Sequence, residues 1–118
     1  MAPSPADFLP LPARDFQVLL ALTEGPRHAY RLTQAVESPG AGVRLELGSL
    51  YRILARLAAA GVIAEDAGPP PSDAREARRR YYRLTAFGRR VADAETARLQ
   101  AVVRLALRRR LAAGRTRS

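Results

Sequence analysis

The sequence lacks cysteine, tryptophan and lysine, and its 118 residues include a single histidine. Without thiols there is no disulfide framework and no thiolate zinc site, and one imidazole leaves almost no material for a Cys or Ser nucleophile system. We therefore expect a protein that is not an enzyme, with no catalytic residue, metal or cofactor. A chain of this length is expected to form one domain, to whose stability a partner subunit could contribute.

Long apolar runs are also absent. The longest nearly apolar stretch, residues 53–64, is interrupted by Arg56 and is far too short to span a bilayer. The first residues, which include Pro3, Pro5 and Asp7, contain no basic region and no apolar run of the kind found in secretory signals. The sequence thus predicts a cytoplasmic protein without a transmembrane helix.

All 20 basic side chains are arginine, and against 11 acidic residues they give a net charge of +9 and an isoelectric point near 11.4. The excess lies in the second half, since residues 1–40 sum to −1, 41–67 to zero, 68–97 to +3 and 98–118 to +7. A GC-rich coding sequence would explain arginine in place of lysine, but not the net charge. The charge indicates a polyanionic partner, which could be nucleic acid, an anionic membrane surface or an acidic protein.

The first part of the chain predicts an arm followed by three short helices. Residues 1–12 contain four prolines and no helical period, so we expect a flexible, extended arm. Helices are predicted from Ala13, at residues 28–37 and at residues 49–60, because apolar side chains recur at helical spacing in each. The apolar face of the third consists of Leu50, Ile53, Leu54 and Leu57. Together these helices predict a trihelical core.

A β-hairpin with a long tip is expected next, over residues 62–84, with its loop at about 66–77. The loop is rich in proline and glycine, whereas residues 78–84 are rich in tyrosine and arginine. Strand alternation places Tyr82 on the inward face and Tyr81 on the other. The predicted fold class is mainly α with a small β-hairpin, and residues 13–84 form one domain.

The last helix is predicted to begin after the N-cap Thr85, to span residues 85–111, and to be followed by a basic tail at 112–118. It would be about 40 Å long, whereas the preceding domain should have a radius of gyration of about 12 Å. Much of the helix would overhang its core and expose apolar side chains, each worth about 1.5 to 3 kcal/mol when buried. We expect a two-fold homodimer; the alternatives are a break near Gln100 or a frayed tail. Interface residues expected on this helix are Leu99, Val102, Val103, Ala106 and Leu107.

Three helices followed by a hairpin form the layout of a winged helix-turn-helix, in which the third helix enters the major groove and the wing lies along the backbone. Five segments carry a closer resemblance: Phe16 to Leu22, Gly25 to Tyr30, Gly48 to Leu54, Leu57 to Ile63, and Arg79 to Gly88. In this order they resemble the PadR family of bacterial transcriptional regulators over about residues 13–107.

The resemblance implies a cytoplasmic homodimeric repressor that binds double-stranded DNA, in the subgroup with one long C-terminal dimerisation helix. It also implies that the first helix joins the dimer interface, through Phe16, Leu19 and Leu20. Some drug-binding members stack planar ligands between tryptophans, and this chain has none. No membrane partner is implied.

The candidate DNA-binding residues lie on the third helix and the wing. Ser49 is expected to cap the helix and could meet a phosphate. Tyr51 and Arg52 project away from the apolar face, and Arg52 is the better candidate for a guanine edge. Arg56 lies near the edge of that face, where it could contact DNA, remain solvated or form an intramolecular ion pair. The wing candidates, suited to phosphate contact, are Arg78, Arg79 and Arg80.

Three functions stay open at this point. The first is repression by a homodimer bound to a palindromic operator. The second adds a small apolar or phenolic effector, bound in a pocket between the C-terminal helices. The third is a winged-helix interaction module that binds protein or RNA rather than an operator. His28 and Tyr30 are expected to be structural, fixing the second helix against the third.

Overall fold

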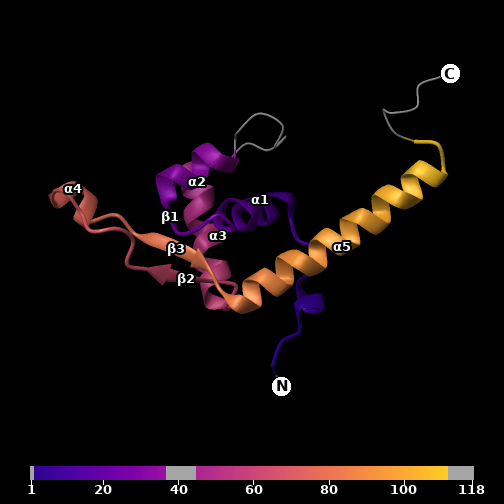
Figure 1. The fold of residues 1–118 in the computed structure, drawn as a ribbon, viewed down its shortest axis with the longest axis horizontal. Helices are drawn as coiled ribbons and strands as arrows, with labels where there is room; N and C mark the ends of the chain where they lie inside the picture. The colour runs from indigo at the N-terminus through magenta and orange to yellow at the C-terminus, as the bar shows by residue number, and fades with distance from the viewer. Residues whose placement is uncertain (1, 37–44, 112–118) are drawn as a thin grey trace.

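A computed structural model of the chain describes residues 2–36 and 45–111 (Figure 1). The elements in chain order are η1 (Pro5–Phe8), α1 (Ala13–Leu22), β1 (Arg27–His28), α2 (Ala29–Val36), α3 (Leu47–Ala59), β2 (Ile63–Asp66), α4 (Ala74–Ala77), β3 (Tyr81–Leu84) and α5 (Ala86–Arg108). The predicted fold class, mainly helical with a small sheet and a long last helix, is confirmed. The expected end of the second helix near Glu37 and the basic tail at 112–118 lie outside the described residues.

The sheet has three antiparallel strands in the order β1-β3-β2. The predicted hairpin forms its larger part, with Ile63 opposite Leu84 and Asp66 opposite Tyr81. Strand β1 pairs Arg27 with Tyr82 and was not predicted, because two residues are too few to show an alternating pattern. Tyr82 is buried, as the alternation predicted.

The core lies where the helical layer meets the inner face of the sheet and the first half of α5. Its fully buried side chains come from α1, α2, α3, β2 and α5 and include Leu19, Leu32, Leu54, Ile63 and Val91. The predicted apolar face of α3 is buried throughout. This burial fixes which face of α3 points outward. Within the part of the chain that the structure describes, no helix is long and apolar enough to cross a bilayer.

Helices α3 and α5 begin differently from each other. Helix α3 begins at Leu47 after the N-cap Glu46, whose side chain makes no capping bond, so the prediction that Ser49 caps this helix is wrong. Thr85 caps α5 as predicted: its hydroxyl accepts a 2.9 Å hydrogen bond from the Gly88 amide and lies 2.7 Å from the Gly61 carbonyl. A cap is therefore a reliable start signal only where its side chain reaches an amide.

The N-terminal segment contains a short helix and packs against α5, so the expectation of an extended arm over residues 1–12 is corrected for the described residues 2–12. Ser4 caps η1 and its amide donates a 2.8 Å hydrogen bond to Asp7. Phe8 packs edge-on against Phe87 with ring centroids 5.5 Å apart, and Leu11 is buried. These contacts are tertiary, which is why a proline count could not reveal them.

Helix α5 projects beyond the rest of the molecule (Figure 1). With α5 included, the principal extents of the molecule are 59 × 39 × 22 Å. It runs without interruption to Arg108, which excludes the predicted alternative of a break near Gln100, and it ends three residues before the expected Leu111. Its outer half exposes large apolar side chains: Val102, Val103, Leu105 and Leu107.

Candidate DNA-binding interface

The outward face of α3 presents two of the predicted residues, Tyr51 and Arg52, to solvent. Arg52 Nη2 donates a 3.1 Å hydrogen bond to Ser49 Oγ, one turn earlier. Ser49 thus restrains Arg52 instead of capping the helix. A planar guanidinium held on an exposed helix face is suited to pairing with O6 and N7 of guanine.

Arg56, on the same helix, is bound within the protein. Its Nη1 and Nη2 donate hydrogen bonds of 2.7 and 3.2 Å to the two carboxylate oxygens of Asp15 on α1. The hydrogen bond to Asp15 raises the pKa of Arg56. Of the three readings that the sequence left open, the structure therefore supports the ion pair and withdraws this guanidinium from the candidate DNA contacts.

The wing tip, residues 67–80, is folded around the short helix α4. Asp73 caps α4 by accepting a 2.8 Å hydrogen bond from the Glu76 amide. The Ser72 amide in turn donates a 2.8 Å hydrogen bond to the Glu76 carboxylate and lowers the pKa of that carboxyl. This reciprocal capping places four exposed arginines on the wing: Arg75, Arg78, Arg79 and Arg80.

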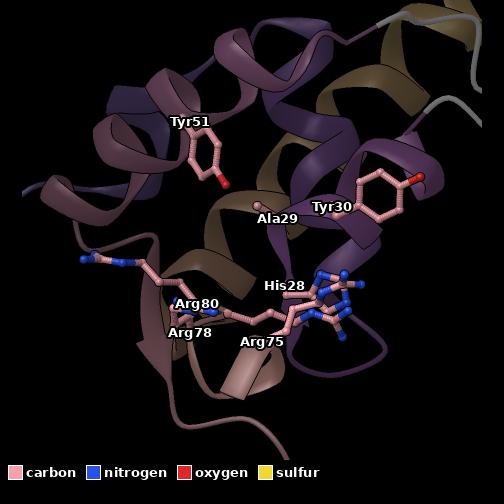
Figure 2. Close-up of a pocket in the computed structure, with 8 residues that line it drawn as sticks. His28, Ala29, Tyr30, Tyr51, Arg75, Arg78 and Arg80 are labelled. Atoms are coloured by element: carbon pink, nitrogen blue, oxygen red, sulfur yellow. The ribbon is translucent and has the colours of Figure 1, made fainter. Parts of the chain in front are cut away.

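A cleft of about 400 Å³ separates the wing from α2 and α3. Its lining consists of His28, Ala29, Tyr30, Tyr51, Arg75, Arg78, Arg79 and Arg80. Figure 2 shows Tyr51 and Tyr30 on one side of the cleft, with Arg75, Arg78, Arg80 and His28 on the other. Among the residues that the structure describes, no carboxylate lines it, so the cleft joins the exposed face of α3 to the wing through a positively charged surface.

His28 lies at the edge of this cleft, and its pKa is lowered from its ordinary value. Burial lowers its pKa, and the charges of Arg79 and Arg31 lower it further. Its ring packs edge-on against Tyr81 with centroids 5.4 Å apart, and its Nδ1 accepts a 3.4 Å hydrogen bond from the Arg31 amide. These contacts join His28 to β3 and to α2 rather than to α3, so they do not test the expected role of fixing the second helix against the third. Tyr30, in contrast, is 62% exposed, so it is not a core residue.

The predicted dimerisation residues fall into separate groups. Phe16, Leu99 and Val103 line an apolar groove of about 340 Å³ between α1 and α5. Leu19 is fully buried in its own core and is not available to a partner, which corrects its inclusion. Leu20 is exposed but lines a different hollow, between α1 and α2. On the outer half of α5, Val102 and Leu107 are exposed and Ala106 is half-buried.

The model of the PadR-like family of transcriptional regulators matches residues 18–94 of the sequence. The chain belongs to the PadR-like family. The matched residues span the winged unit from α1 to the middle of α5, so the resemblance predicted from the sequence motifs is confirmed. No protein of curated function matches the sequence.

Solved structures agree with the PadR-like assignment. A PadR family transcription regulator of Clostridium difficile has a TM-score of 0.70 at 18% identity, covering 82% of this chain and 97% of that one. A transcriptional regulator of Clostridium thermocellum has a TM-score of 0.66 at 23% identity, with coverages of 80% and 87%. A PadR family regulator of Eggerthella lenta has a TM-score of 0.58 at 27% identity, with coverages of 77% and 78%. This PadR-like chain is therefore a DNA-binding transcriptional regulator and not an enzyme.

The roles of two residues, Arg75 and Asp15, were missed in the sequence. Arg75 was assigned to the loop, and only the fold of α4 turns it toward the cleft. Asp15 contributed only to the net charge of residues 1–40, although it is 2% exposed and binds Arg56. A signal for Arg75 existed in the Ser-Asp-x-x-Glu pattern at residues 72–76, which is typical of a capped helix start. No local signal existed for Asp15, because its partner is 41 residues away.

Proposed function

We propose that this regulator is a homodimeric repressor that works in the cytoplasm and binds a palindromic operator through α3 and the wing. The observation that carries the proposal is the continuous cationic surface formed by the exposed face of α3, the cleft and the wing arginines. Tyr51 and Arg52 enter the major groove, and Ser49 holds Arg52 for base recognition. Arg78, Arg79 and Arg80 contact phosphates and contribute affinity rather than sequence preference.

The dimer is supported by the overhanging half of α5 and by the groove beside it. A second copy would cover Val102, Val103 and Leu107, which otherwise stay exposed to water. The groove lined by Phe16, Leu99 and Val103 adjoins this stripe and extends the apolar surface onto α1. A two-fold dimer presents two copies of α3, so the matching operator has two inverted half-sites.

Repression follows when the bound dimer occludes a promoter, which requires no further group of the protein. A small apolar or phenolic effector is the second proposal, and the apolar groove with Thr96 and Gln100 at its edge is the observation that favours it. Such an effector would act by changing the packing of α5 against α1, and thereby the distance between the two copies of α3.

Selection of bound fragments from genomic DNA, followed by sequencing, tests the proposed function. The expected result is a common inverted repeat that the purified protein binds with an affinity falling steeply with salt. A module that binds protein or RNA would return no common repeat, and that result would contradict the proposal. Sedimentation of the free protein at micromolar concentration is expected to give the mass of a dimer.

A further inference from the structure

Three arginines of the wing tip form no ion pair among the described residues: Arg75, Arg78 and Arg79. Of these, Arg79 lies near enough to Glu76 for its charge to lower the pKa of that carboxyl. All three line the cleft that faces Tyr51. Figure 2 shows the Tyr51 side chain extending from α3 into the space above the wing, with its hydroxyl at the end farthest from the helix. The cleft thus places guanidinium donors and a phenol hydroxyl around one hollow that no described carboxylate lines.

The carboxylates closest to this cleft in the chain already have hydrogen-bond or ion-pair partners, one of which, Arg80, lines the cleft. Glu76 accepts a hydrogen bond from the Ser72 amide, and Glu65 forms a 3.2 Å ion pair with Arg80. Asp66 accepts a 2.9 Å hydrogen bond from the Gly68 amide and lies 3.7 Å from Arg83. The positive charge of Arg75 and Arg78, and the part of the Arg79 charge that Glu76 does not offset, are therefore available to an external anion.

The conformation of the wing tip is fixed by its own contacts. Gly68 has φ +71° and packs against the ring of Tyr81, where a Cβ atom would collide with the ring. The capping bonds of Asp73 and Glu76 hold α4 at the other side of the loop. A loop held in this way loses little conformational entropy when it binds, so its arginines act as a preorganised anion site.

We propose that this cleft binds one phosphodiester group of the DNA backbone, held by Arg75 and Arg79 from the wing and by the Tyr51 hydroxyl from α3. The inference rests on the proposed DNA-binding face and adds a contact that the sequence did not predict, that of Arg75. Because a phosphate carries no sequence information, Arg75 contributes equally to operator and unrelated duplexes. One neutralised phosphate also corresponds to a slope of about 0.9 in the dependence of log affinity on log salt.

Fluorescence anisotropy with the selected operator and with an unrelated duplex tests the assignment. Arg75→Ala is expected to weaken binding to both duplexes by the same factor, about tenfold, and to reduce the salt slope by about 0.9. Arg89→Ala is the control. Arg89 is an exposed arginine of α5 that forms no ion pair among the described residues, and its removal is expected to leave affinity unchanged. Equal binding by wild type and Arg75→Ala, with Arg52→Ala still impaired, would overturn the cleft site and leave the DNA-binding face intact. Failure of the wild type to bind the operator would overturn both the cleft site and the proposed DNA-binding face.

A second measurement identifies the anion. Methylphosphonate substitution, one backbone position at a time, is expected to reveal a position whose neutralisation weakens wild type but adds no further loss in Arg75→Ala. Additive losses at every position would overturn the assignment. Inorganic phosphate added at constant ionic strength is expected to compete equally with wild type and Arg75→Ala. Selective competition against wild type would assign the cleft to free phosphate instead.

Discussion

Arg56 on α3 donates two hydrogen bonds, of 2.7 and 3.2 Å, to the carboxylate of Asp15 on α1, which is 2% exposed. The pair joins α3, the helix proposed to face DNA, to α1, which lines the apolar groove through Phe16. Its charges are thus used to fix α3 within the protomer, while Arg52, one turn earlier, remains exposed.

Arg56→Ala is expected to lower the free energy of unfolding by about 1–3 kcal/mol, because it leaves the buried Asp15 carboxylate without its partner. The loss stays in this range because the Arg56 side chain is itself 57% exposed and water can replace part of the contact. Urea unfolding followed by circular dichroism measures it. Arg52→Ala is the matched control and is expected to change the free energy by less than about 0.5 kcal/mol. Equal effects of the two substitutions would contradict the pairing.

Gly88→Ala is expected to destabilise the protein by about 2 kcal/mol or more, because its Cβ would collide with the Val62 carbonyl and with Leu84. Gly48→Ala is the control, since its Cβ would meet nothing within 4 Å. That change is expected to be neutral or to stabilise α3 by up to about 1 kcal/mol through helix propensity. Thermal unfolding distinguishes them, and a tolerated alanine at position 88 would contradict the close packing of α5 on the sheet.

Glu95 gives stability a specific pH dependence. Hydrogen bonds from Arg98, together with one from the Leu11 amide, hold the pKa of the buried Glu95 carboxyl below its usual 4.5, although burial acts to raise it. A carboxyl whose pKa is depressed by folding stabilises the protein above its unfolded pKa, and this contribution is lost as pH falls through the folded pKa.

Wild type is therefore expected to lose more stability between about pH 6 and about pH 3 than Glu95→Gln does. Urea unfolding at several pH values measures the difference. Asp93→Asn, at an exposed position of the same helix, is the control and is expected to parallel wild type. Identical curves for wild type and Glu95→Gln would refute a role for this carboxyl in fixing the N-terminal segment to α5.

Val103→Glu is expected to convert the proposed dimer into a monomer, because it puts a charge into the apolar groove that we propose a second copy covers. Ala101→Glu adds the same charge at an exposed position that does not line the groove and is expected to leave the dimer intact. Sedimentation equilibrium at micromolar concentration measures both. Dimers of unchanged affinity in both variants would place the interface elsewhere.

Features set by neighbouring residues were predictable from the sequence. The Thr85 cap of α5 and the burial of Tyr82 were predicted, because a cap reaches only three residues along the chain and side chains alternate within one short strand. Features set by distant contacts were not predictable. The ordering of the N-terminal segment depends on Phe8 meeting Phe87, and the fate of Arg56 depends on Asp15. The candidate site followed the same division, since Tyr51 and Arg52 were found from the face of α3, whereas Arg75 required the fold of the wing tip.

Binding of the selected operator by Arg52→Ala and Arg79→Ala tests most directly whether α3 and the wing form the DNA-binding surface. Arg79→Ala is expected to weaken operator and unrelated duplexes by the same factor and to reduce the salt slope by about one. Arg52→Ala is expected to cost about 1–3 kcal/mol of discrimination at one base pair of each half-site. Unchanged operator affinity and discrimination in both variants, with both folded as wild type, would contradict the assignment of this surface.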